Sequence, residues 1–305
     1  MTSPKTGSDP WGEFWSSKEG LLGGGCLPTR GEGIDKPQRM AWQSFARELP
    51  RSAHVLDLAT GDGRVMGWML GARRDIKPMG IDLAARIPKP PKGSRSKGGI
   101  AMEALPFADA SYDAVTSQFG FEYGEPEAVL REIARVLKPR GRAALMTHRL
   151  DGAILEVNRH RRAGLAWALD EAGLAAKARG ALALRELVAV APAAVRDAPD
   201  EARRMFGAHS AGWELAEAIC QTLTHGRADH PSNVLALIGT LEAKARNEIG
   251  RIESLESACL TVADPDALKR RYGESGLSVE AHCLIEVDGR PLADMWTLRR
   301  RPPDL

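Results

Sequence analysis

The residues from His54 to Arg64 read His-Val-Leu-Asp-Leu-Ala-Thr-Gly-Asp-Gly-Arg. An apolar run that carries one acid, Asp57, ends at a glycine turn over residues 60–63, and residues compatible with a helix follow. Glycine lets the backbone adopt unusual dihedral angles and approach a ligand closely. The start of a helix adds free N–H groups and partial positive charge. The pattern therefore predicts a strand, a turn and a helix start that hold part of a nucleotide-like cofactor.

A second acid, Asp82, ends the apolar run 79–83 and follows Asp57 by 25 residues. A carboxylate at this place can accept hydrogen bonds from the ribose hydroxyls of an adenosine. An NAD-dependent enzyme places an acid similarly, so the two acids alone do not decide the cofactor. The turn, however, begins with Ala59, where the dinucleotide fingerprint has glycine. This difference disfavours an NAD-dependent oxidoreductase.

Strands and helices alternate around these acids. Strands are expected over 54–59, 79–83, 99–103, 112–119 and 143–147, and helices over the segment that contains Val65 and Leu70 and over 126–138. No helix is expected over 86–99, which contains three prolines. Alternation at this spacing predicts an α/β domain with a parallel sheet and helices on both faces.

The pattern changes after residue 151. Helical runs are expected at 153–178, 180–190, 200–223 and 232–262, the last with an apolar residue every three or four positions. A helix over 265–276, capped by Asp264, and two strands over 278–287 and 292–299, joined by Asp288-Gly289, then follow. We therefore expect an α/β domain over 51–150 and 263–305, interrupted by a helical insertion over 151–262 that serves as an acceptor cap or an oligomerisation surface.

The first 50 residues are expected to form N-terminal helices and a lid. Ser8-Asp9-Pro10 is typical of a helix start, and Trp11, Phe14 and Trp15 follow at helical spacing. A glycine-rich loop over 20–33 and a second helix over 37–48 come next. The aromatic residues suggest a helix that closes over the cofactor, and packing at the edge of the core explains them equally well.

Composition limits the remaining classes of protein. The chain has 305 residues, a net charge of +2 and 43% hydrophobic residues, as in a globular protein without the basic excess of a dedicated nucleic-acid binder. Its four cysteines, at 26, 220, 259 and 283, lack metal-ligand spacing, so we expect no metal site and reduced thiols. No apolar run approaches the roughly 20 residues of a membrane helix, and no apolar signal core begins the chain. We therefore expect a cytoplasmic protein.

Three more segments follow the two acids in order: 103–107, 112–115 and 132–141. With 55–64 and 80–83, they resemble the class I S-adenosylmethionine-dependent methyltransferases, in particular the type 11-like members. The resemblance covers about 40–148 and 264–300. It implies a Rossmann-like seven-stranded, mostly parallel sheet with an antiparallel last strand, and S-adenosylmethionine as the cofactor.

The resemblance also implies roles for individual residues. Asp57 and the turn would hold the methionine part, Asp82 the ribose, and Leu83 would pack on the adenine. In relatives an aspartate often stands at the position of Ala101, so Glu103 or a backbone group would substitute for it here. The implied cofactor-binding residues are Asp57, Ala59, Thr60, Gly61, Gly63, Asp82, Leu83, Met102, Glu103, Gln118 and Phe119.

The acceptor is not identified by these motifs. Glu122, Tyr123 and His148 are the candidate bases, needed only if the nucleophile arrives protonated. The loop 118–123 lacks the Asn/Asp-Pro-Pro-aromatic signature of enzymes that methylate amino groups of nucleic-acid bases, which disfavours such a substrate. Basic side chains gather at 86–97 and 149–162, where a solvated surface is the ordinary explanation.

Three hypotheses remain open. The first is a methyltransferase with a small-molecule or lipid-like acceptor, and the second is an RNA or protein methyltransferase that uses the basic clusters. The third is a non-catalytic binding or assembly module. In that case the long helix 232–262 would be a partner surface, and a homodimer through the insertion is conceivable on its apolar face.

Overall fold

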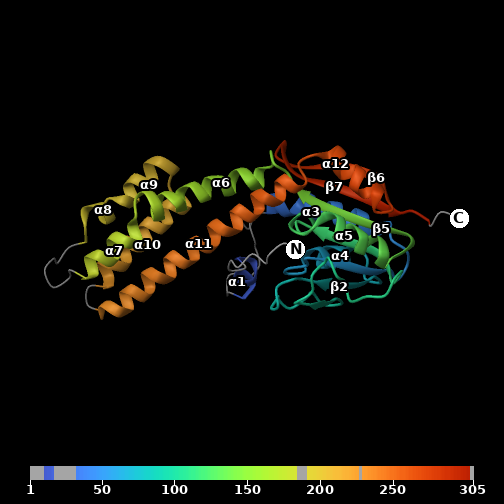
Figure 1. Cartoon of the computed structure of the whole chain (residues 1–305), viewed down its shortest axis with the longest axis horizontal. Helices are drawn as coiled ribbons and strands as arrows, with labels where there is room; N and C mark the ends of the chain where they lie inside the picture. Colours follow the sequence, from blue (N-terminus) through green and yellow to red (C-terminus); the bar gives the residue numbers. More distant parts are fainter. Residues whose placement is uncertain (1–9, 17–31, 184–190, 227–228, 303–305) are drawn as a thin grey trace, which may run out of the picture. The chain divides into compact units, whose positions relative to one another are not determined.

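The computed structural model describes residues 10–16, 32–183, 191–226 and 229–302. The chain forms two compact units (Figure 1). The sheet unit comprises the residues up to Leu155 together with Ser254–Leu305, and the helical unit comprises Glu156–Glu253. The predicted helix cap at Ser8-Asp9, most of the predicted loop 20–33, Cys26 and the end of the predicted run 180–190 lie outside the described residues.

The sheet unit contains a seven-stranded sheet in the order β3-β2-β1-β4-β5-β7-β6. Strand β7 runs antiparallel to both neighbours, and the pairs from β3 to β5 are parallel. The predicted fold class, a mostly parallel Rossmann-like sheet with an antiparallel last strand, is thereby confirmed. The strands are β1 (His54–Leu58), β2 (Lys77–Ile81), β3 (Arg95–Lys97), β4 (Tyr112–Gln118), β5 (Leu137–His148), β6 (Leu277–Val287) and β7 (Arg290–Arg300).

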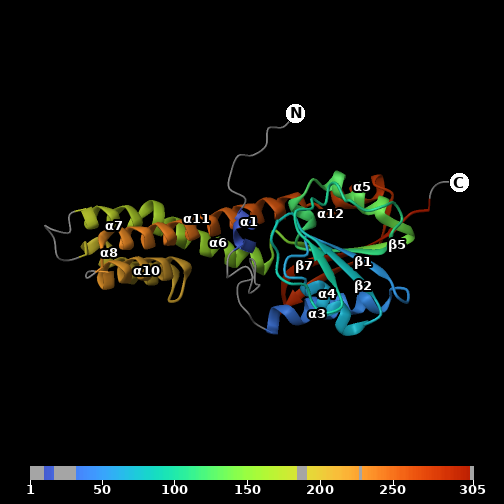
Figure 2. The same ribbon diagram turned by 90° about the horizontal axis from the view of Figure 1, so that it is seen from below.

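Helices cover both faces of the sheet (Figure 2). Helices α3 (Glu32–Arg47) and α4 (Arg64–Ala72) lie on one face, and α5 (Pro126–Val136) and α12 (Pro265–Glu274) lie on the other. Side chains of a strand alternate between faces, so Val55 joins the core beneath α3 and α4, while Leu56 and Leu58 join the core beneath α5 and α12. The central strands β1 and β4 are therefore buried on both sides, as in doubly wound folds.

The third strand lies elsewhere than predicted. It spans Arg95–Lys97, and the prediction of a strand over 99–103 was wrong. An edge strand with exposed faces needs no apolar alternation, which is why the basic Arg-Ser-Lys segment carries no strand signal. The apolar residues that suggested a strand instead cross the carboxyl end of β2, where the amide of Ile100 donates to the carbonyl oxygen of Asp82 at 2.9 Å.

Other boundaries also moved. Strand β5 begins six residues before its predicted start and contains Arg140 at φ 64°, and α3 begins five residues early. The cap of α12 is as predicted, because Asp264 accepts hydrogen bonds from the amides of Asp266 and Ala267. The hairpin is as predicted too, with Asp288 and Gly289 both at positive φ.

The helical unit is built from a series of helices. Two predicted runs are interrupted, because Gly173 at φ 59° ends the first and Gly207 at φ 89° ends α9. The predicted helix 232–262 is continuous, as α11. The described elements are α6 (Ala153–Ala166), a π-helical turn (Trp167–Glu171), α7 (Leu174–Ala183), α8 (Ala193–Arg196), α9 (Ala198–Phe206), α10 (Ala211–His225) and α11 (Pro231–Thr261).

Candidate active site

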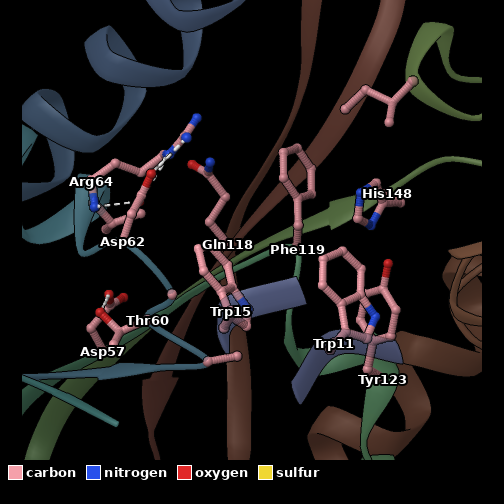
Figure 3. A pocket seen from close by; sticks show the side chains of 14 residues that line it. Trp11, Trp15, Asp57, Thr60, Asp62, Arg64, Gln118, Phe119, Tyr123 and His148 are labelled. Atoms are coloured by element: carbon pink, nitrogen blue, oxygen red, sulfur yellow. Dashed lines mark hydrogen bonds and ion pairs between the residues drawn. The ribbon is translucent and has the colours of Figure 1, made fainter. Parts of the chain in front are cut away.

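Two adjoining cavities lie at the carboxyl ends of the parallel strands, the usual place for ligands in open α/β sheets. The first cavity (Figure 3) adjoins the ends of β1, β4 and β5, and the second adjoins the ends of β1, β2 and β4. Ala59 and Tyr123 line both. The first is lined further by Asp57, Thr60, Gly61, Asp62, Arg64, Gln118, Phe119 and His148, and the second by Asp82, Leu83, Ile100, Ala101, Met102 and Glu103.

The glycine turn contributes to both cavities, because Ala59 lines both and Thr60 and Gly61 line the first. Ala59, Gly61 and Gly63 all have positive φ, at 52°, 52° and 74°. For Ala59 this left-handed conformation costs about 1–2 kcal/mol, so the surrounding structure must impose it. The carboxylate of Asp82 does part of this, because it accepts a hydrogen bond from the Gly61 amide at 2.9 Å and one from the Ala84 amide at 2.9 Å. The second predicted acid thus also holds the turn.

Asp57 lies beneath the turn with 1% of its surface exposed. Its two oxygens accept hydrogen bonds from the hydroxyls of Thr60 and Thr116, each at 2.7 Å. Burial raises the pKa of Asp57 to about 6, although the two hydroxyls act in the opposite direction. A buried carboxylate of this kind suits a cationic ligand, because a nearby positive charge would favour its ionised form.

The second cavity combines a carboxylate with an apolar wall. Leu83 is 66% exposed, which is high for a leucine and leaves its side chain available to a ligand. Ile100 and Met102 add further apolar surface, and Oε1 of Glu103 accepts a hydrogen bond from the Glu125 amide at 3.2 Å. Asp82, Leu83, Met102 and Glu103, all predicted to bind the adenosine part of the cofactor, therefore line one cavity.

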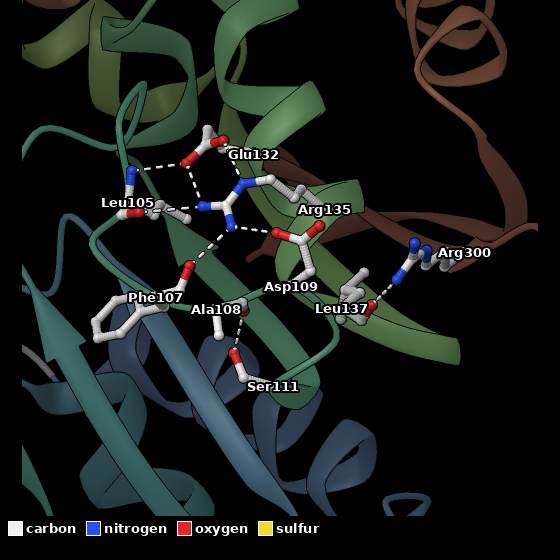
Figure 4. A network of polar contacts seen from close by, with 9 residues as sticks. All are labelled: Leu105, Phe107, Ala108, Asp109, Ser111, Glu132, Arg135, Leu137 and Arg300. Carbon is white, nitrogen blue, oxygen red and sulfur yellow. Dashed lines mark hydrogen bonds and ion pairs between the residues drawn. The ribbon is translucent and has the colours of Figure 1, made fainter.

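A network of polar contacts fixes the loop that forms this wall (Figure 4). The guanidinium of Arg135 donates to both carboxylate oxygens of Glu132, to Asp109, and to the carbonyl oxygens of Leu105 and Phe107, at 2.7–3.0 Å. Glu132 in turn accepts from the Leu105 amide at 2.7 Å. This network explains the Glu-Ile-Ala-Arg motif of α5 as an anchor for the loop rather than a contact with a ligand.

Gln118 and Phe119, at the end of β4, make different contacts: Gln118 bonds to helix α3, and Phe119 packs on His148. The side chain of Gln118 lines the first cavity, but its amide accepts from the indole of Trp42 at 2.5 Å and donates to Gln38 at 2.9 Å. Phe119, at φ 56°, stacks on the ring of His148 with ring centres 4.1 Å apart. No sequence signal pointed to Trp42 and Gln38, because both lie on α3, far from β4 in the chain.

Two of the three candidate bases, Tyr123 and His148, line the first cavity, and the third, Glu122, is buried in contact with His148. Oε1 of Glu122 accepts a hydrogen bond from the His148 amide and lies 2.8 Å from His148 Nδ1. The side chain of Glu122 is fully buried and that of His148 is 5% exposed. An ionised Glu122 places the proton on Nδ1, which leaves a lone pair on Nε2. Tyr123 contacts the edge of the same imidazole, with ring centres 6.1 Å apart.

Helix α1 (Pro10–Ser16) brings two tryptophans to both cavities (Figure 3). Trp11 packs edge-on against Tyr123, with ring centres 5.8 Å apart. Trp15 lies over the glycine turn so closely that a β-carbon on Gly61 would come within 2.8 Å of its ring. These contacts support the sequence-based suggestion that this helix covers a ligand, which remains a proposal.

No metal centre adjoins these groups. In the part of the chain that the structure describes, no three His, Cys, Asp or Glu side chains gather as a metal site would require. Nor does any described helix have both the length and the apolarity needed to cross a membrane.

Comparison with known proteins agrees with this geometry. Residues 56–145 match the family model described as a methyltransferase domain. The match spans β1 through most of β5 and so includes the turn, Asp82 and the loop held by Arg135. Over this segment the chain is therefore similar to methyltransferase domains, and its sheet topology agrees with the resemblance to the class I S-adenosylmethionine-dependent methyltransferases.

Individual relatives share this part of the chain. The demethylmenaquinone methyltransferase of Thermotoga maritima is 38% identical over 97 residues, which is 30% of this chain and 42% of that protein. The malonyl-[acyl-carrier protein] O-methyltransferase of Methylococcus capsulatus is 31% identical over 38% of this chain and 46% of that protein. The ubiquinone/menaquinone biosynthesis C-methyltransferase UbiE of Geotalea uraniireducens is 33% identical over 37% of this chain and 53% of that protein. The chain thus spans about half the length of these relatives.

Proposed function

We propose that this chain is an S-adenosylmethionine-dependent methyltransferase whose acceptor is a small or lipid-like molecule with a protonated nucleophile. The observation that carries the proposal is the buried Glu122–His148 pair, whose imidazole lines the same cavity as Asp57, Thr60 and Gly61, while Glu122 is buried in contact with His148. The pair offers a base where a nucleophile would have to lose a proton. The turn and its two acids offer a cofactor site beside it.

The residues of the two cavities fit this cofactor. The ionised Asp57 would hold the ammonium of the methionine part, and Asp82 would accept hydrogen bonds from the ribose hydroxyls with its remaining lone pairs. Leu83 and Ile100 would pack on the adenine, and Glu103 or a neighbouring backbone group would meet its amino group. When bound, S-adenosylmethionine supplies a methyl group that a nucleophile can take from the sulfonium, with the sulfur leaving as a neutral thioether.

The chain's own residues would contribute alignment and one proton transfer. Nε2 of His148 would take the proton of the acceptor's nucleophile, and the carboxylate of Glu122 would stabilise the imidazolium so formed. Phe119, stacked on the ring, would hold the imidazole plane in place. Trp11 and Trp15 would exclude water from the first cavity, which strengthens these electrostatic effects.

Two observations favour a small or lipid-like acceptor over nucleic acid. The wall of the first cavity is largely aromatic and aliphatic, from Trp11, Phe119, Tyr123 and Ile154. In the second basic cluster, Arg149 pairs with Asp151 and Asp294, and Arg161 pairs with Glu248. Those arginines are therefore already neutralised. The names of the relatives, which refer to quinones and to a malonyl group, agree with such an acceptor.

The helical unit is part of the same proposal, as the acceptor cap. Helix α6, through which the chain enters this unit, begins at Ala153, five residues after His148, and Ile154 lines the first cavity.

Calorimetry and a turnover assay test the proposal. S-adenosylhomocysteine should bind at sub-millimolar concentration. Turnover is then followed by the formation of S-adenosylhomocysteine from S-adenosylmethionine, with quinols, phenols and carboxylic acids screened as acceptors. His148→Gln should lower kcat by about 10²–10⁴-fold and leave the dissociation constant of S-adenosylhomocysteine unchanged. His54→Gln, on an exposed residue at the opposite end of the sheet, is the matched control. Failure to bind S-adenosylhomocysteine would refute the proposed methyltransferase function. Full turnover by His148→Gln would refute the role of His148 as the base.

A further inference from the structure

Three buried polar atoms behind the Glu122–His148 pair have no hydrogen-bond partner among the described residues: Oε2 of Glu122, the hydroxyl of Tyr272 and Nε1 of Trp296. The three side chains are at most 1% exposed. They come from three separate parts of the sheet unit, namely the turn after β4, helix α12 and strand β7. A buried polar atom without a partner is costly and rare in native proteins.

The three groups belong to one region of the core. The rings of Tyr272 and Trp296 lie 5.7 Å apart, and the ring of Phe121, next to Glu122 in the chain, lies 6.5 Å from that of Tyr272. Burial raises the pKa of Tyr272, and the negative charges of Glu122 and Asp294 raise it further. The hydroxyl therefore lies within electrostatic range of the Glu122 carboxylate.

The three atoms offer complementary hydrogen-bond donors and acceptors that a water molecule between them could bridge. The carboxylate oxygen accepts, the indole N–H donates, and the phenol hydroxyl can do either. None of the three makes a direct hydrogen bond to another. A buried water typically makes about three hydrogen bonds to polar groups of this kind.

We propose that Glu122, Tyr272 and Trp296 bind one buried water, and that Tyr272 is a positioning residue for the proposed methyl transfer. Through this water the Tyr272 hydroxyl keeps Glu122 ionised and keeps its other oxygen on His148 Nδ1. His148 then retains a lone pair on Nε2 and gains a partner for the imidazolium. The inference rests on the proposed function for its catalytic meaning, whereas the water site stands on the geometry alone.

The charges around the pair explain why Glu122 needs this support. Asp294 also faces Tyr272, but it is already paired with Arg149 at 2.8 Å and with His282 at 2.7 Å. Arg271, on the same helix as Tyr272, pairs with Glu127 at 3.1 Å. His148 is the titratable partner in contact with Glu122, and Tyr123 contacts the imidazole from the other side. Loss of one hydrogen bond to Oε2 therefore shifts the proton of the pair toward the carboxylate.

The test is a titration of the histidine rings by NMR in the protein without ligand. In Tyr272→Phe, Glu122 should retain its proton to higher pH, so the pKa of His148 should fall by about one unit. His148→Gln assigns the resonance, and Tyr112→Phe, which removes a hydroxyl from the same hydrophobic core at a distance from the pair, should leave the titration unchanged. A pKa of His148 that is the same in Tyr272→Phe as in the wild type would overturn the proposal.

Two further measurements keep the result interpretable. If Tyr272→Phe does not fold, Trp296→Phe removes another donor to the same water and should shift His148 in the same direction. Calorimetry with S-adenosylhomocysteine separates the two ideas. Absence of binding together with a shifted titration would refute the proposed function and leave the water site. Normal binding together with an unshifted titration would refute the water site and leave the proposed function.

Discussion

Replacement of Asp57 by asparagine should stabilise the fold and weaken the cofactor site. Burial raises the pKa of Asp57 from 3.8 to about 6, a shift of about two units, and each unit corresponds to about 1.4 kcal/mol. The ionised carboxylate therefore destabilises the folded protein by about 3 kcal/mol at neutral pH. Asparagine has the same shape without the charge, and the hydroxyls of Thr60 and Thr116 can rotate to bond its amide.

The stability gained by Asp57→Asn should depend on pH. A carboxyl group whose pKa is raised on folding binds its proton more tightly in the folded state, so the wild type gains stability as the pH falls from about 6 toward 4. The advantage of Asp57→Asn should be complete above about pH 7, should shrink as the pH falls below about 6, and should be small near pH 4, where the folded wild type is protonated and the unfolded state is partly protonated.

Thermal melts at pH 8 and pH 5 measure the effect. A domain of this size gains about 2–4 °C per kcal/mol, so an increase of about 6–12 °C is the upper bound at pH 8. Binding of S-adenosylhomocysteine should weaken at least about tenfold, because a charged hydrogen bond to its ammonium is lost. A less stable Asp57→Asn at pH 8, or an advantage that is as large at pH 5 as at pH 8, would show that burial of the charge does not control the stability of this site.

Asp113 provides the matched control. Its partial burial raises the pKa, but the ion pair with Lys138 and the His54 amide lower it overall. Asp113→Asn should therefore destabilise the protein at pH 8, with a loss that shrinks as the pH falls, the opposite trend to Asp57→Asn.

Two further substitutions test the cofactor cavity and its support. Asp82→Ala should weaken S-adenosylhomocysteine binding by about 1.5–3 kcal/mol, measured by calorimetry, and should also lower the melting temperature, because the amides of Gly61 and Ala84 lose their acceptor. An unchanged affinity would remove Asp82 from the ribose site. Arg135→Ala should lower the free energy of unfolding by about 2–4 kcal/mol in urea, because two carboxylates and two carbonyls lose their donor. Arg131→Ala, on the exposed face of the same helix, should change it by less than about 0.5 kcal/mol, and equal effects of the two would contradict the anchoring role.

The elements that could be predicted from the sequence are those whose signals are local. Asp264 marks the start of α12, Asp288-Gly289 fixes the hairpin, and apolar periodicity gives α11. Strand β3 could not be predicted, because an exposed edge strand buries no apolar face. The break at Gly173 was missed because a glycine within an alanine-rich run is compatible with a helix until its φ is known.

The candidate site shows the same division. Asp57, Asp82 and the turn residues Ala59, Thr60 and Gly61 were singled out from two short stretches of sequence and line the cavities, whereas Gly63, also predicted, lines neither. The partner of Asp57 on β4 could not be foreseen, because Thr116 reaches it from a neighbouring strand, 59 residues further along the chain. Side-chain contacts between distant segments depend on strand order and register, which a single sequence does not specify.

The two borders of the sheet determine how the protein behaves at high concentration. An exposed strand offers unpaired backbone groups to another chain and so invites aggregation. Strand β3 is only three residues long and exposes Arg95 and Lys97, which repel a second copy of the same strand. Strand β6 is longer, but its pairing is interrupted between Val279 and Ala281 and again between Ile285 and Glu286. Short length and charge at one border, and bulges at the other, therefore disfavour the pairing of either edge with a second chain.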